Sequence, residues 1–174
     1  MDLTDFALLL LRLWIGFVMI MHGFNHATSL EGTARWFDSV GFRSAKLNAR
    51  LSAYAELAIG VGIAVGFLTS FALAGMVATV FVAFWAIHRF AGFFVFYRPD
   101  EGYEYVATLA IAGLVLAILG PGAASVDDVL GIAGSLDGAV GALIVLGGLA
   151  AGAAQAAVFW RKPEAKTDDS QGET

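Results

Sequence analysis

The chain has 174 residues, of which 59% are hydrophobic and 14% are charged, and it contains no cysteine. This composition indicates a membrane protein rather than a soluble domain. The lack of cysteine excludes disulfides, thiol nucleophiles and Cys-ligated zinc or iron–sulfur sites. A formal net charge of −5 without a basic cluster argues against a nucleic-acid partner.

Five apolar stretches approach the roughly 20 residues that an α-helix needs to cross the hydrocarbon core. We therefore expect an all-α membrane protein, with a four-helix transmembrane bundle plus an additional C-terminal transmembrane helix. The first stretch has no basic leader and no small-residue cleavage site, so we expect it to be retained. The second and third must form an antiparallel hairpin because only a short turn separates them. The predicted spans are residues 6–26, 50–68, 70–90, 103–119 and 139–160.

Lysine and arginine gather on one side of the predicted bundle. The N-terminus, the 68–70 turn and the 120–138 loop share the other side and contain none. Because basic residues near helix ends are retained in the cytoplasm, we expect an external N-terminus and a cytoplasmic C-terminus. Apart from Arg12 inside the first span, the basic residues on the predicted cytoplasmic side are Arg35, Arg43, Lys46, Arg50, Arg89, Arg98, Arg161, Lys162 and Lys166.

The segments between and after the spans suggest a simple domain organisation. Residues 27–49 carry aromatic side chains among charges, which is typical of an interfacial amphipathic helix. The polar C-terminal segment cannot bury apolar surface, and we expect it to be disordered. The predicted parts are a four-helix membrane domain at 1–131, an additional transmembrane helix at 132–162 and a disordered cytoplasmic tail at 163–174.

Ionisable residues collect at the cytoplasmic end when each helix is given its rise of about 1.5 Å per residue. His22 and His26 share one face at the lower end of the first span. The second span contributes Glu56, the third ends near Arg89, and the fourth begins with Tyr103 and Glu104. The cluster that we predict is His22, His26, Glu56, His88 and Glu104.

Glu56 is the most informative member, because a carboxylate inside a membrane helix costs on the order of 2–4 kcal/mol unless it is paired, protonated or hydrated. One interpretation is a structural ion pair or hydrogen bond with Arg89, Tyr103 or a histidine. The other is a proton-exchange or ligand site. The sequence leaves both interpretations open.

The histidines also permit metal or haem binding, which we rank below a structural role at the interface. His22 and His88 could supply two axial imidazoles to a b-type haem across the bundle. His22 and His26 have the spacing of a zinc-binding pair but lack the glutamate of the H-E-x-x-H motif, so we predict no metal site.

The external end carries a separate buried charge. Arg12 lies within the first span, and its nearest expected partners are Asp127, Asp128 and Asp5. We predict a structural ion pair between Arg12 and Asp127 that clamps the first helix to the loop after the fourth. Small-residue spacings at Gly62–Gly66 and Gly148–Gly152 suit close helix approach.

An ordered series of short motifs over about residues 6 to 131 resembles the DoxX family of small bacterial membrane proteins. At the position where relatives often carry a lysine after His-Gly, this chain has Asn25-His26, and it adds the 139–160 helix. The motifs are Leu11-Arg12-Leu13 with Gly16, Phe17 and His22-Gly23; Ala55-Glu56-Leu57 with Gly60; His88; Tyr103-Glu104; and Gly120-Pro121-Gly122 with Ser125-Val126-Asp127.

The resemblance implies a bacterial cell-membrane protein related to subunits of oxidoreductase assemblies, including a thiosulfate:quinone oxidoreductase and a complex with superoxide dismutase and a sulfurtransferase. Quinone chemistry fits the polar cluster, because a quinone headgroup needs hydrogen-bond donors and a proton source beside an apolar groove. We assign catalytic roles to Glu56, His22 and His88, and ligand-binding roles to His26, Glu104, Tyr103 and Arg89.

The leading hypothesis is a membrane subunit that binds a quinone or similar lipophilic ligand for redox-enzyme partners. Electrons would have to come from such a partner or from a haem. The alternative is a non-catalytic scaffold or anchor that recruits cytosolic proteins. A small transporter is a third hypothesis, which the lack of evident repeats or broken helices disfavours.

Overall fold

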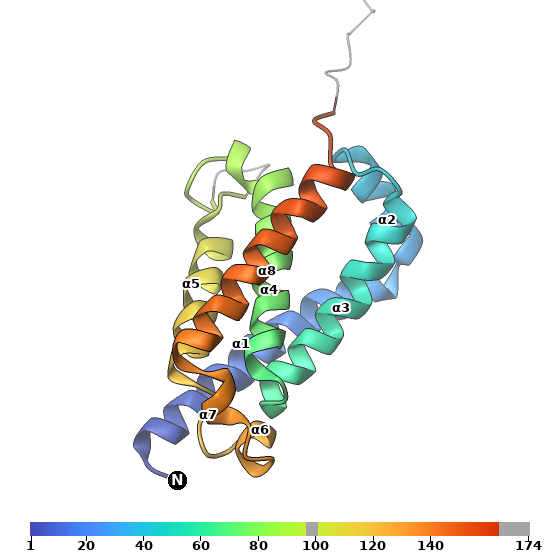
Figure 1. The fold of residues 1–174 in the computed structure, drawn as a ribbon. Helices are drawn as coiled ribbons and strands as arrows, with labels where there is room; N and C mark the ends of the chain where they lie inside the picture. Colours follow the sequence, from blue (N-terminus) through green and yellow to red (C-terminus); the bar gives the residue numbers. More distant parts are fainter. Residues whose placement is uncertain (97–100, 164–174) are drawn as a thin grey trace, which may run out of the picture.

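The computed structural model describes residues 1–96 and 101–163 (Figure 1). These residues form helices only, apart from an isolated antiparallel bridge between Phe42 and Trp160, so the predicted all-α fold is confirmed. Arg98, Lys166 and the expected tail beyond Pro163 lie outside the described residues. The elements are α1 (Leu3–Thr28), α2 (Leu30–Ser39), α3 (Ala45–Val65), α4 (Thr69–Ala86), η1 (His88–Phe90), α5 (Glu104–Leu119), α6 (Val126–Val129), α7 (Ala133–Leu136) and α8 (Gly138–Phe159).

The long helices pack as two close pairs, α1 on α3 and α4 on α8. The hairpin of α3 and α4 joins the pairs, and α5 lies beside α4 and α8 (Figure 1). The N-terminus lies at one end of the bundle with α6 and α7, whereas α2 and the end of α8 lie at the other (Figure 1). Each of the five predicted spans therefore coincides with a helix.

Three helices among the described residues, α1, α4 and α8, are long and apolar enough to cross a membrane. The fourth apolar helix, α5, is shorter at 16 residues. Large apolar side chains such as Trp14, Ile111 and Leu143 are exposed on the outside of the bundle. An apolar outer surface around satisfied helical backbone is the arrangement that a lipid environment requires.

Small residues set the close contact within each pair. A Cβ atom added at Gly16 would lie 2.6 Å from the carbonyl oxygen of Gly60, and one added at Gly60 would lie 2.7 Å from that of Gly16. On the other pair, Gly148 and Gly152 lie against the backbone of Ala74 and Ala78. The interpretation of the 148–152 spacing as a close-approach motif is thus confirmed.

In the predicted spacing at residues 62–66, the second glycine ends a helix instead of forming a close contact between helices. Gly66 lies at φ +70°, where it caps the C-terminus of α3. Glycine adopts this left-handed conformation without the steric cost that a side chain brings. A side chain at Gly66 would also collide with the guanidinium of Arg12. Gly66 therefore ends a helix and makes room for a buried cation.

Arg12 is 0% exposed, and its guanidinium donates hydrogen bonds to the carbonyl oxygens of Ala64, at 3.3 Å, and Ala124. The predicted clamp between the first helix and the loop after α5 is present, but backbone carbonyls make it. Asp127 instead accepts from the amides of Leu68 and Thr69 and from the Thr69 hydroxyl, at 2.7–2.8 Å. No direct Arg12–Asp127 ion pair forms within 4 Å in the described part of the chain.

Two helix boundaries differ from the prediction. The α-helix of the third span ends at Ala86, so His88 and Arg89 lie on the 3-10 turn η1. The helix of the second span begins at Ala45, five residues before the predicted start at residue 50. Between the first two spans, α2 buries Thr33, Ala34 and Phe37, packs on α3, and exposes charged residues on its other face. The amphipathic helix expected in that segment is therefore present.

Candidate functional site

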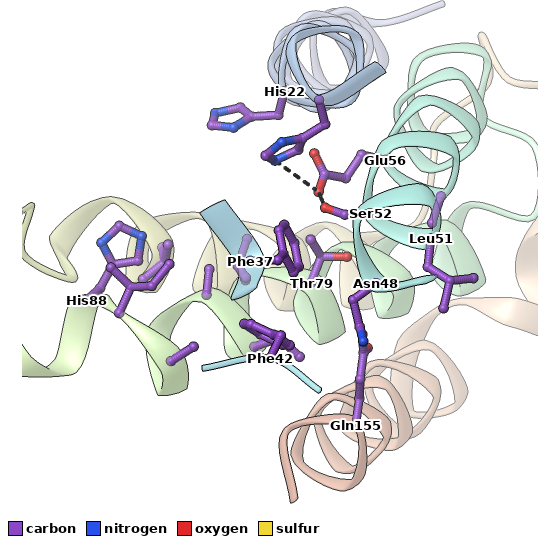
Figure 2. Close-up of a pocket in the computed structure, with 18 of the residues that line it drawn as sticks. His22, Phe37, Phe42, Asn48, Leu51, Ser52, Glu56, Thr79, His88 and Gln155 are labelled. Atoms are coloured by element: carbon purple, nitrogen blue, oxygen red, sulfur yellow. Dashed lines mark hydrogen bonds and ion pairs between the residues drawn. The ribbon is translucent and has the colours of Figure 1, made fainter. Parts of the chain in front are cut away.

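A cavity of about 610 Å³ lies at the end of the bundle that carries α2. Its wall is formed by α1, α3, α4, α5 and α8, and residues from α2 and the following turn, including Phe37 and Phe42, close one side (Figure 2). Most of the wall is apolar. The polar and ionisable residues in it are His22, His26, Asn48, Ser52, Glu56, Thr79, His88, Glu101, Tyr105 and Gln155.

One face of α3 supplies a row of polar groups to this cavity. Asn48, Ser52 and Glu56 are four residues apart, which places them one above another on a helix with 3.6 residues per turn. All three line the cavity (Figure 2). The sequence of α3 thus builds a polar stripe into an otherwise apolar wall.

Glu56 is the buried carboxylate of the site, with 3% of its surface exposed. Its Oε1 accepts a hydrogen bond from the Ser52 hydroxyl and lies 3.9 Å from Nε2 of His26 (Figure 2). Its Oε2 has no hydrogen-bond partner within the described residues. A buried carboxyl oxygen without a partner is costly. A ligand that donates to it, or a proton on it, would remove that cost.

The two histidines of α1 occupy different surroundings. Nε2 of His22 lies 3.3 Å from the Tyr105 hydroxyl, and the two rings stack with centroids 6.0 Å apart. Both residues are exposed as well as lining the cavity, so the cavity opens to the surface beside them. His26 is half-buried, with its ring packed against Trp36 and Phe37 and its Nε2 facing Glu56. The predicted pair on one helix face is confirmed.

His88 lines the same cavity from η1, and its Nδ1 lies 2.7 Å from the carbonyl oxygen of Glu101. In Figure 2 it lies apart from the Glu56 group. The proposed haem ligands His22 and His88 thus both have polar contacts already, and ligation through Nε2 of His22 would require it to leave Tyr105. No group of three or more histidine or carboxylate side chains comes together as a metal site in residues 1–96 and 101–163.

Three predicted ligand-binding residues do not line the cavity. The Arg89 guanidinium lies over the rings of Trp85, at 3.8 Å, and Phe90, at 4.5 Å. Tyr103 packs edge-on against the rings of Phe84 and Phe93 in the core. Glu104 opens α5 at the helix end. Of the predicted site residues, only His22, His26, Glu56 and His88 line the cavity, and His88 lies apart from Glu56.

Several polar residues of the cavity were not predicted as site residues, namely Asn48, Ser52, Tyr105 and Gln155. Asn48 and Ser52 precede Glu56 at four-residue intervals. The sequence of the second span could therefore have shown that all three share one helix face. Gln155 is the one polar side chain in the apolar run 139–159. A lone amide in a membrane helix is itself a signal of a buried partner or a site.

The DoxX family model matches residues 7–89, a shorter stretch than the predicted 6–131. Comparisons with curated proteins and with solved structures give no match. The matched region runs from α1 to η1 and includes every histidine of the cavity as well as Glu56, whereas Tyr105 and Gln155 come from helices beyond it. This match confirms the predicted resemblance to the DoxX family over residues 7–89.

Proposed function

We propose that this protein is an integral membrane subunit that binds a quinone or a similar lipophilic ligand in the cavity beside Glu56, within a membrane-associated oxidoreductase complex. Its N-terminus would face the outside of the cell and its C-terminus the cytoplasm, as the distribution of basic residues favours. The cavity would then lie at the cytoplasmic end of the bundle.

The observation that carries the proposal is Oε2 of Glu56, which has no hydrogen-bond partner among residues 1–96 and 101–163 and lies at the wall of a largely apolar cavity. When it is protonated, this oxygen can donate to a quinone oxygen. A volume of about 610 Å³ falls in the range of small-molecule sites, which combine apolar walls with a few polar groups. The exposed rim at His22 and Tyr105 offers an entrance from the surface of the bundle, where a lipophilic ligand dissolved in the bilayer would arrive.

Quinone reduction needs two electrons and two protons for each molecule of quinol formed. The electrons would come from a redox-enzyme partner through its own cofactor. The protons would pass through Glu56 and His26, whose facing oxygen and nitrogen atoms are 3.9 Å apart. General acid catalysis requires a proton donor within hydrogen-bond reach of the quinone oxygen, and the cavity places this pair at its wall.

Ligand binding is tested by titrating the purified chain, reconstituted in lipid nanodiscs, with a decyl-substituted benzoquinone. We expect saturable binding that weakens about threefold in Glu56→Gln, because the quinone oxygen only accepts hydrogen bonds and the amide N–H of Gln is a weaker donor than the O–H of protonated Glu56. Glu31→Gln is the matched control, because Glu31 lies on the exposed face of α2 and does not line the cavity. Equal affinity in all three proteins would overturn the assignment of Glu56.

Gentle purification from native membranes distinguishes a quinone-binding subunit from a non-catalytic scaffold. Recovery of a redox enzyme, together with slower quinone reduction by the Glu56→Gln complex, supports the proposal. Recovery of the same enzyme with full quinone turnover in that variant favours the non-catalytic scaffold, because the polar residues would then serve only the packing of the helices.

A further inference from the structure

The cavity has a second polar group at the end opposite Glu56, where α3 and α8 meet. Asn48 is 1% exposed, and its side-chain nitrogen donates to the carbonyl oxygens of Arg43, at 3.0 Å, and Ser44, at 3.4 Å. Its side-chain oxygen accepts from Nε2 of Gln155, at 3.3 Å, and the two side chains point toward each other in Figure 2. An amide pair thus bridges the two helices at the cavity wall.

This network fixes which way the Gln155 amide faces. The Asn48 nitrogen faces the backbone carbonyls of Arg43 and Ser44, so the Asn48 oxygen is the atom left to accept from Gln155. Gln155 therefore presents its nitrogen to Asn48, and the second hydrogen of that nitrogen has no partner within residues 1–96 and 101–163. Because Gln155 lines the cavity, that hydrogen is available to a ligand acceptor.

The distance between the two polar ends suits a ring with acceptors at both ends. Asn48 and Glu56 are eight residues apart on α3, which corresponds to about 12 Å along the helix axis. A six-membered ring with an oxygen at each end, and a hydrogen bond of about 3 Å at each oxygen, spans on the order of 10 Å. In the view of Figure 2, Phe37, Phe42 and Thr79 lie to one side of the line from Glu56 to Gln155.

We infer that Gln155 is a specificity-determining residue that donates a hydrogen bond to the second oxygen of a para-quinone whose first oxygen lies at Glu56 and His26. This inference rests on the proposed function and narrows its ligand from a lipophilic molecule to a ring with two opposed acceptors. It also gives α8, which lies beyond the family match, a direct part in ligand choice.

The test compares two probes on the reconstituted full-length chain: a para-naphthoquinone with a decyl tail, and a tetralone with the same tail that keeps one carbonyl. The wild type is expected to bind the quinone about fivefold more tightly than the tetralone, the factor of one net hydrogen bond. Gln155→Met, which keeps the length of the side chain, should bind both probes with the tetralone's affinity. Ala154→Leu changes an exposed neighbour outside the cavity and should keep the preference.

Tetralone binding also reports whether the cavity of each variant is folded. An undiminished preference for the quinone in Gln155→Met would overturn the inference and leave the proposed function standing. Equal weakening of both probes in that variant would overturn it as well, because Gln155 would then only hold α8 against α3. A wild type that binds neither probe would refute the proposed function and this inference with it.

Discussion

Asp127→Ala should destabilise the protein strongly, although Asp127 lies at the opposite end of the bundle from the cavity. The carboxylate is 1% exposed and accepts three hydrogen bonds, from the amide nitrogens of Leu68 and Thr69 and from the Thr69 hydroxyl. It thereby caps the N-terminus of α4, where a negative charge is favourable. It also holds Leu68 at φ +45°, a conformation that a residue with a side chain adopts at a cost.

The expected loss of stability follows from the hydrogen-bond donors that Asp127→Ala leaves without an acceptor. Each buried donor without a partner costs about 1–3 kcal/mol, so the loss of three acceptor contacts should cost at least about 3 kcal/mol of unfolding free energy. For a chain of this length that corresponds to a fall in Tm on the order of 10 °C. Thr69→Val removes one of the three bonds and should cost about 1 kcal/mol.

The assay is thermal unfolding of the protein in detergent micelles, followed by circular dichroism. Asp128→Ala is the matched control, because the neighbouring Asp128 side chain is exposed, and it should leave Tm nearly unchanged. A Tm of Asp127→Ala within 2 °C of the wild type, a limit of about 1 kcal/mol, would refute this account of the α4 cap.

Three further substitutions probe the packing of the helices. Gly60→Leu should lower Tm and reduce cysteine cross-linking between α1 and α3, because a Cβ at this position collides with the backbone of Gly16. Gly148→Leu should detach α8 from α4 in the same cross-linking assay, whereas Gly147→Leu, which points into open space, should be tolerated. Arg12→Lys should lower Tm by several degrees, since one ammonium group does not reproduce the fork that reaches two carbonyls in different segments.

The helices could be predicted because the apolar runs have the length that the membrane demands. Their polar ends could not be placed so well. The helix α3 already begins at Ala45, within a polar segment, and the side chain of Asn48 ties its first turn to the carbonyls of Arg43 and Ser44. The third span leaves α-helical geometry at Ile87, whose φ of −130° no hydropathy pattern specifies.

The site was predicted in part for a similar reason. Counting residues along each helix gives the depth of a side chain, and this placed the three histidines and Glu56 at one end. It does not give the direction in which the side chain points, since successive residues turn by about 100° on a helix. Tyr103 therefore packs into the core while Tyr105 lines the cavity.

Contacts between distant segments account for the remaining differences. The Asn48–Gln155 pair depends on where the packing of α8 against α4 and α5 places Gln155, which the sequence of α3 or α8 does not reveal. The ion pair between Arg12 and Asp127 was expected because the two side chains carry opposite charges. In the structure, Asp127 accepts hydrogen bonds from backbone amides instead. The buried arginine is met by two carbonyls instead. A prediction that pairs only charged side chains cannot find these partners, because they are backbone groups.

The central claim is that a quinone occupies the cavity between the α3 stripe and α8. Photolabelling tests it most directly, with a photoreactive azido-quinone added to native membranes and the labelled residues mapped by mass spectrometry. The account predicts labels on α3 between Asn48 and Glu56 and at Tyr105, which disappear when excess unlabelled quinone competes. Labels spread over outward-facing residues such as Ile111 and Leu143, unchanged by the competitor, would contradict it.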